Sequence, residues 1–277
     1  MQVVAFACLA LTLCGVNAKL KKSLNGTTAV VTGGAKGIGY AIAENLLKNG
    51  AKSVIIVDIN KPRGMEAVWK IIFRKYKYVH VLVNNAGILD ENDPIGTINT
   101  NTIAPMLWSM KFYDAMRMDR GGNGGTIVNI ASVVSYFRDP FFWFYKTSKF
   151  GVLGLSLGLG HEYNFKHSGV RVYALCPGFT YTAMTDQQMV VDDQLELFMK
   201  FREALPWQSA EEVAQAALTL HRTARTGMSY SVDGGEGTFM YPYFARYMYL
   251  IRVIIIIIIS PNTSHCWARA SSTTERV

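Results

Sequence analysis

A glycine-rich turn between a strand-like run and a helical stretch is the feature that most constrains the fold of this chain. The β-branched run Ala29–Thr32 leads into four glycines between Gly33 and Gly39, and an amphipathic pattern follows to Lys48. Glycines in such a turn let the backbone approach a pyrophosphate, whose charge then lies at the N-terminus of the helix. The order of strand, turn and helix predicts a dinucleotide-binding unit.

Four later runs have the composition of buried strands, being short, apolar and rich in Val, Ile or Leu. Half of the residues are apolar, so a single large core is expected. Helical stretches separate these runs, which predicts an α/β domain over residues 24–240. We expect a Rossmann-type, doubly wound, mostly parallel sheet with helices on both faces. The four runs are Ser53–Asp58, Val79–Val83, Gly124–Ser132 and Val170–Cys176.

Asp58 ends the strand that follows the first helix, 25 positions after Gly33. A carboxylate there accepts hydrogen bonds from adenosine ribose hydroxyls and repels a 2′-phosphate, which favours NAD over NADP. Lys36 in the glycine turn argues for NADP, because a cation there would pair with that phosphate. We weigh Asp58 more heavily, since burying a carboxylate against a phosphate costs more than leaving a lysine in solvent.

Tyr145 and Lys149 lie four residues apart, so on a helix they share one face. A free tyrosine titrates near pH 10, and an adjacent ammonium stabilises the phenolate. The pair therefore predicts a tyrosine that acts as a general base. The alternative interpretation is an aromatic and a lysine on an ordinary amphipathic helix. The strand before this helix ends at Ser132, at the sheet edge where ligands of open α/β sheets bind.

Three motifs together identify a family: the turn Thr32–Gly39, the segment Asn84–Gly87, and Tyr145–Lys149. In this order and spacing, the chain from Leu24 to Gly237 resembles the short-chain dehydrogenase/reductase family. The resemblance implies hydride transfer between an alcohol and a nicotinamide cofactor, with the protein supplying position and electrostatics.

The same resemblance implies roles for individual residues. The catalytic group would be Asn101, Ser132, Tyr145 and Lys149, with Ser135 as the alternative to Ser132 and Asn99 as the alternative to Asn101. The segment after the Val170–Cys176 strand matches the nicotinamide-side loop of the family. The implied cofactor-binding residues are Thr32, Gly33, Gly37, Ile38, Gly39, Asp58, Asn85, Ala86, Gly87, Lys149, Pro177, Gly178 and Thr182.

Within the family, the chain resembles the branch of insect alcohol dehydrogenases and NAD-dependent 15-hydroxyprostaglandin dehydrogenases. This implies a secondary alcohol as substrate and a homodimer as the assembly. Specificity is expected in residues 135–144 and 184–205. The first region carries Phe137, Phe141, Phe142, Trp143 and Phe144, which predicts a hydrophobic or lipid-like alcohol; the alternative is that these aromatics form core or dimer contacts.

The interval between Asp58 and Asn84 is too short for the family pattern. It holds 25 residues, of which the last five belong to the Val79–Val83 strand. A helix, a strand and a second helix need about 27 residues before loops, whereas residues 62–73 supply one helix. We therefore expect one edge strand and one helix to be missing, which opens the adenine pocket. The rival hypothesis is a catalytically weak or inactive binding or storage protein with the same fold.

The net charge of +8 does not predict nucleic-acid binding, because the basic residues are dispersed. The four cysteines form no Cys-x-x-Cys or Cys/His cluster, so no metal site is expected, and Cys176 is predicted to be a core residue.

The two ends of the chain differ from its middle in composition. The apolar run Val3–Gly15 precedes small residues ending at Ala18, which predicts a signal peptide over residues 1–18 and secretion; the alternative is a cytoplasmic enzyme with an unprocessed leader. Residues 241–277 contain six consecutive isoleucines, Ile254–Ile259, without period, and we expect a non-native or disordered tail. A membrane-dipping tail is the alternative. Both apolar runs are too short for a stable membrane span.

Overall fold

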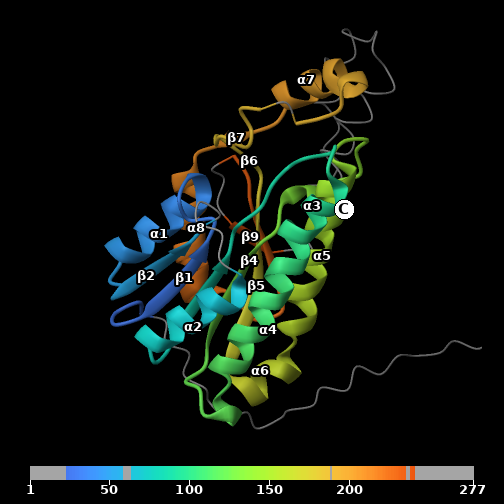
Figure 1. Ribbon diagram of the computed structural model, residues 1–277. Coiled ribbons are helices and arrows are strands. Elements are labelled where there is room, and N and C mark those ends of the chain that lie inside the picture. The colour runs from blue at the N-terminus through green and yellow to red at the C-terminus, as the bar shows by residue number, and fades with distance from the viewer. Residues whose placement is uncertain (1–22, 59–63, 188, 235–237, 241–277) are drawn as a thin grey trace, which may run out of the picture.

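A computed structural model describes residues 23–58, 64–187, 189–234 and 238–240, and its centre is a seven-stranded sheet between layers of helices (Figure 1). The strand order is β2-β1-β3-β4-β5-β8-β9, and every neighbouring pair is parallel except β8 with β9. This confirms the predicted Rossmann-type architecture. The strands are β1 (Thr28–Thr32), β2 (Ser53–Val57), β3 (Val81–Asn84), β4 (Gly125–Ile130), β5 (Val170–Pro177), β8 (Ser229–Val232) and β9 (Thr238–Met240), with β6 (Phe179–Thr180) and β7 (Trp207–Gln208) forming a separate parallel pair.

Helices cover both faces of the sheet. Helices α1 and α8 pack on one face, where the largest apolar cluster lies, and α2, α4 and α5 pack on the other. The helices are α1 (Gly37–Lys48), α2 (Met65–Lys75), α3 (Pro94–Ile98), the π-helical turn η1 (Asn99–Ile103), α4 (Ala104–Met116), α5 (Trp143–Leu159), α6 (Glu162–Ser168), α7 (Leu195–Glu203) and α8 (Ala210–Thr223); short 3₁₀ turns are η2 (Met118–Arg120), η3 (Val133–Ser135) and η4 (Asp192–Gln194).

The central strands are buried along their whole length. Every residue of β1, β3 and β5 is buried, and β4 is buried from Thr126 onward. A parallel sheet covered on both faces needs such continuous apolar runs, which explains why these segments show no alternation of polar and apolar residues. The single free cysteine in the described residues, Cys176, lies in this core as predicted.

Strand β2 forms one edge of the sheet and is much less covered. It pairs with β1, none of its residues is fully buried, and Ile56 is 47% exposed. Among residues 64–80, which lead from this edge to β3, the structure describes α2 alone. The expected absence of an edge strand and a helix is thus confirmed for the described part of this interval.

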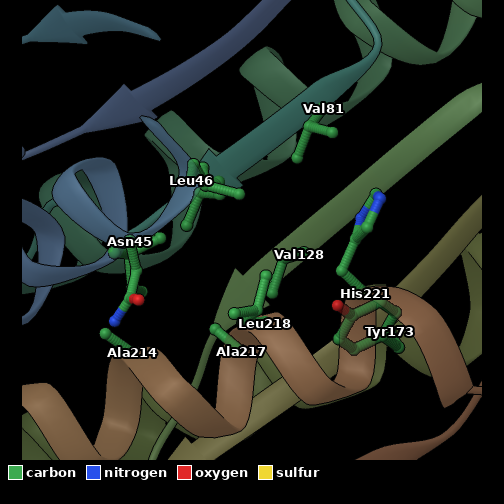
Figure 2. A pocket seen from close by; sticks show the side chains of 11 residues that line it. Asn45, Leu46, Val81, Val128, Tyr173, Ala214, Ala217, Leu218 and His221 are labelled. Carbon is green, nitrogen blue, oxygen red and sulfur yellow. The ribbon is translucent and has the colours of Figure 1, made fainter. Parts of the chain in front are cut away.

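A small cavity of about 10 Å³ lies between α1, α8 and the sheet (Figure 2). Its walls include Leu46 and His221 of the two helices and Val128 and Tyr173 of the sheet. It therefore lies on the face of the sheet that α1 and α8 cover, away from α5. A volume near that of one water indicates close packing rather than a substrate site.

An aromatic cluster joins residues of β6 and α7 to the two residues before α5. We use this name for Phe141, Phe142, Phe179, Phe198 and Phe201, whose ring centroids lie 5.3–6.4 Å apart in contacting pairs.

No helix among the described residues is long and apolar enough to cross a membrane. The predicted signal peptide (residues 1–18) and the predicted irregular tail (residues 241–277) lie outside the described residues.

Candidate active site

The glycine turn after β1 is shaped by residues that admit no side chain. Gly33 has a φ of 62°, and a Cβ built on it would lie 2.7 Å from the Cα of Ala86. A Cβ on Gly39 would overlap the carbonyl oxygen of Gly33 and the side-chain nitrogen of Asn85. Both positions therefore require glycine, because the turn, the start of α1 and the end of β3 touch one another.

Hydrogen bonds join this turn to the segment after β3. Thr32 Oγ1 accepts from the backbone N–H of Asn85 at 3.0 Å and of Ala86 at 3.1 Å. Asn85 Nδ2 in turn donates to the carbonyl oxygens of Thr32 and Gly33 at 3.1 and 3.0 Å. The structure thus brings four of the sequence-predicted cofactor residues, Thr32, Gly33, Asn85 and Ala86, into one hydrogen-bonded unit.

Asp58 and Thr182 both contact the glycine turn or the start of α1. Asp58 Oδ2 accepts from the backbone N–H of Ala35 at 3.0 Å, at the carboxyl end of β2. A Cβ on Gly37 would lie 3.4 Å from the γ-methyl of Thr182, in the segment that follows β6. Pro177 ends β5, and Gly178 packs against Asp233 beyond β8. Asp58 and Thr182 therefore lie next to the turn that leads into α1, where Gly37 and Ile38 begin the helix.

Tyr145 and Lys149 lie in the first two turns of α5, as the spacing predicted. The Lys149 ammonium is buried, lies 5.4 Å from the centroid of the Tyr145 ring, and donates to the carbonyl oxygen of Ile130 at 3.0 Å. The Ser132 side chain favours the phenolate form of Tyr145 and so lowers the pKa of Tyr145. The hydroxyl of Ser135 is buried and has no hydrogen-bond partner among the described residues, so the geometry favours Ser132.

Burial determines the proton affinities of this pair. It raises the pKa of Tyr145 to about 12, against the opposing effect of the Ser132 side chain. It lowers the pKa of Lys149 to about 8, against the opposing charge interaction with Cys176. Desolvation is the largest effect on the pKa of Tyr145, whose side chain is partly buried against the apolar cluster. That Lys149 makes Tyr145 usable as a base stays a prediction.

Asn101 lies in the π-helical turn η1 and is buried, whereas Asn99 is exposed. The Asn101 side chain donates to the carbonyl of Ile88 at 2.8 Å and to Ser148 Oγ at 3.0 Å, and it accepts from the Ile88 N–H at 2.8 Å. A Cβ on Gly87 would lie 3.2 Å from Asn101 Oδ1 and 3.5 Å from Lys149 Nζ. Asn101, Gly87 and Lys149 therefore meet at one point, which favours Asn101 over Asn99.

A buried amide network behind the site was not predicted from the sequence. Asn84 Nδ2 donates to Ser109 Oγ at 2.9 Å and to Asn129 Oδ1 at 2.8 Å, and Asn129 Nδ2 donates to Ser156 Oγ at 2.9 Å. It connects β3 and β4 with α4 and α5. The available signal was an asparagine inside each of two apolar strands, since buried amides need partners.

The aromatic residues expected to determine specificity are divided by the structure. Phe137, Phe141 and Phe142 are buried in an apolar core cluster, Phe144 is half-buried, and Trp143 is 53% exposed. The Phe142 ring meets the Tyr145 ring edge-on at 6.4 Å between centroids. The alternative of core packing therefore holds for the first three, of which Phe142 also borders the site.

A second residue that the sequence did not indicate is Glu91. Its carboxylate accepts from the backbone N–H of Phe144 at 3.1 Å and of Tyr145 at 2.9 Å. No cluster of His, Cys, Asp and Glu suited to a metal ion occurs within the described ranges.

Comparison with known proteins gives a consistent result. The family model described as short chain dehydrogenase matches residues 27–72 and 54–190, and the two matches overlap over residues 54–72, from β2 into α2. Alcohol dehydrogenase 1 of Ceratitis cosyra is 32% identical over 188 residues, which cover 58% of this chain and 73% of that protein. The 15-hydroxyprostaglandin dehydrogenase [NAD(+)] of Homo sapiens is 32% identical over 191 residues, covering 59% and 71%.

Solved structures share the same architecture. A provisionally named NAD(P)-dependent gluconate 5-dehydrogenase from Beutenbergia cavernae, solved with NADP at low occupancy, superposes with a TM-score of 0.62 and 28% identity. The superposition covers 77% of this chain and 98% of that chain.

Proposed function

Because this chain belongs to the short-chain dehydrogenase family, we propose that it oxidises a secondary alcohol with NAD, using Tyr145 as the general base. The observation that carries the proposal is the buried Lys149 ammonium, which lies 5.4 Å from the centroid of the Tyr145 ring on the same helix and meets Asn101 at Gly87. Relatives with about 30% identity are alcohol and 15-hydroxyprostaglandin dehydrogenases, which supports this reaction class.

The residues around the N-terminus of α1 fit a dinucleotide. The turn is closed to side chains at Gly33 and Gly39, and the helix N-terminus carries the partial positive charge that a pyrophosphate needs. Asp58 and Thr182 would hold the two ends of the cofactor, the ribose and the carboxamide. When bound, NAD supplies the hydride acceptor.

The preference for NAD rests on Asp58. Its carboxylate already reaches the turn through the Ala35 N–H, so a phosphate on the ribose would meet a negative charge at short range. Lys36 is exposed at the start of α1 and remains solvated, which weakens its case for NADP.

The chain's own residues account for proton transfer. Ser132 holds the alcohol oxygen through its hydroxyl, and Tyr145 accepts the alcohol proton. Lys149 lies beneath the tyrosine ring, and Asn101 fixes the backbone at Ile88 and the Ser148 hydroxyl beside it. Because burial raises the pKa of Tyr145 to about 12, we expect the rate of alcohol oxidation to increase with pH through the neutral range.

The substrate is proposed to be apolar near its carbinol carbon. Phe142, Leu89 and Met184 pack in the apolar cluster that also contacts Tyr145. A hydrophobic secondary alcohol would extend this packing, whereas a polyol would leave its hydroxyls without partners.

A second copy of the chain is the proposed partner. Trp143, Phe150 and Leu157 recur every seventh residue on α5 and are 41–53% exposed, and Leu107 and Met110 of α4 are 48% and 58% exposed. Two adjacent helices with such apolar surfaces favour a homodimer.

Formation of NADH with a panel of secondary alcohols of increasing apolar size tests the function. We expect turnover that increases with chain length, is faster with NAD than with NADP, and is lost in the variant Tyr145→Phe. The open β2 edge favours the rival role of a binding protein, and NAD binding without turnover of any alcohol would support that role instead.

A further inference from the structure

The first turn of α5 is closed by a side chain that is distant in sequence. Phe142, the residue before the helix, contributes no side-chain hydrogen bond, so the backbone N–H groups of the first turn need another acceptor. Glu91 provides it: one carboxylate oxygen accepts from Phe144 N at 3.1 Å and the other from Tyr145 N at 2.9 Å. A carboxylate at a helix N-terminus also interacts favourably with the helix dipole.

The backbone at this point is held in a conformation that it would not adopt by itself. Phe142 has a φ of 57° and a ψ of 48°, and it is the single non-glycine residue with positive φ in the described part of the chain. Its side chain is buried against the rings of Phe198, Phe179 and Tyr145. A bulky residue in the left-handed region persists only where its surroundings fix it. Aromatic packing fixes one side, and the two hydrogen bonds to Glu91 fix the next two residues.

Glu91 also belongs to a segment that holds other parts of the site. Ile88 exchanges two hydrogen bonds with the Asn101 side chain, and the carbonyl oxygen of Leu89 accepts from Gln187 Nε2 at 3.3 Å. Gln187 lies in the segment that follows Thr182. Residues 88–91 therefore contact the π-helical turn, the loop after β6 and the first turn of α5.

We propose that Glu91 is a positioning residue for the proposed dehydrogenase reaction, whose carboxylate fixes the first turn of α5 and so holds the Tyr145 ring in place beside Lys149 and Phe142. The inference rests on the proposed function for its catalytic consequence, but its structural part concerns Tyr145 alone. A displacement of about 1 Å at a reacting group lowers rates by about a hundredfold in the extreme case, so a loosened helix start has a measurable effect.

The test compares Glu91→Ala and Glu91→Gln with Glu212→Ala in the full chain. Glu212 completes the capping box at the start of α8, so its loss also removes a carboxylate cap but at another helix. The cofactor-independent readout is the Cζ resonance of Tyr145 in protein labelled with ¹³C-tyrosine, assigned with Tyr145→Phe. We expect this signal to shift in Glu91→Ala, to shift less in Glu91→Gln, which keeps one acceptor oxygen, and to stay unchanged in Glu212→Ala.

Kinetics give the second readout. We expect kcat for alcohol oxidation to decrease about tenfold or more in Glu91→Ala with KM changed less than about threefold, and both to stay within about twofold in Glu212→Ala. A Tyr145 signal that is unchanged in Glu91→Ala overturns the inference, whatever the rate. A wild-type protein without turnover refutes the proposed function, while the resonance still decides the role of Glu91.

Discussion

The β4–β5 side of the sheet and its β2 edge differ in how deeply their residues are buried. Around β4, β5 and α5, the side chains of Ser132, Lys149 and Asn101 are buried and hydrogen-bonded. Around β2, no residue of the strand is fully buried. The comparison indicates that the chemistry and the affinity for the cofactor are separable here. We expect a site that reacts normally once loaded but binds its dinucleotide weakly on the adenosine side.

The largest effect should follow from removing the base. Tyr145→Phe keeps the ring that packs against Phe142 but removes the hydroxyl, so turnover should decrease by about 10²–10⁴-fold with little change in stability. Initial rates of NADH formation and thermal unfolding measure the two quantities. Tyr113→Phe is the control, because its hydroxyl bonds the carbonyl of Asn164 far from the site. Equal losses of turnover in both variants would contradict the role of Tyr145 as the base.

The second effect concerns the buried ammonium. Burial lowers the pKa of Lys149 to about 8 in the folded protein, against the 10.5 of an ordinary lysine in the unfolded chain, so the unfolded chain binds the extra proton between these values. Stability should therefore increase as pH increases from about 8 towards 10.5, by about 3 kcal/mol at most. Lys149→Met should lack this increase. Urea unfolding of both proteins across this range measures the difference, and parallel curves would contradict the buried charge.

A smaller effect is expected on the adenosine side. Asp58→Ala removes the carboxylate that reaches the turn, so the ratio of kcat/KM for NADP to that for NAD should increase by about tenfold, or about 1.4 kcal/mol. Asp114→Ala, at an exposed ion pair with Arg120, is the control and should leave the ratio unchanged. An unaltered ratio in Asp58→Ala would assign cofactor preference to other groups, with Lys36 as the first candidate.

The smallest effect compares the two sides directly. Ile127 of β4 is fully buried and Ile56 of β2 is 47% exposed, so one methyl group can be deleted from each. Ile127→Val should cost about 1 kcal/mol of unfolding free energy, and Ile56→Val less than about 0.5 kcal/mol. Chemical denaturation of both variants gives these values. A similar cost at both positions would indicate that the β2 edge is covered in solution.

The sequence predicted those parts of the site that depend on short spacing. Tyr145 and Lys149 share a helix face because they are four residues apart, and Ser132 ends a run with the composition of a buried strand, its role being implied by the family resemblance. The shortened interval after Asp58 was also visible as a count of residues. In each case, local geometry is sufficient to place the residue.

Glu91 and Phe142 could not be found in this way. Glu91 lies among Asp90, Asn92 and Asp93, any of which is able to cap a helix, and its contact with α5 joins positions 53 and 54 residues apart. The left-handed backbone of Phe142 arises from packing against α7, which no local pattern indicates. The desolvation that raises the pKa of Tyr145 could not be predicted from spacing either, because burial around the pair is a property of the whole fold.

The π-helical turn from Asn99 to Ile103 has a consequence for how this protein can change over evolution. A π turn contains one residue more than the α-helical turn it replaces, and each residue of an α-helix rotates the chain by about 100°. Removing the residue before Asn101 in this turn would rotate Asn101 away from Ile88 and Ser148 without changing the chemistry of the remaining side chains. Substitutions are constrained at Asn101 and Thr102, which both bond to Ser148, but insertions and deletions are constrained along the whole turn. Selection would therefore act on the number of residues in this turn as well as on their identity.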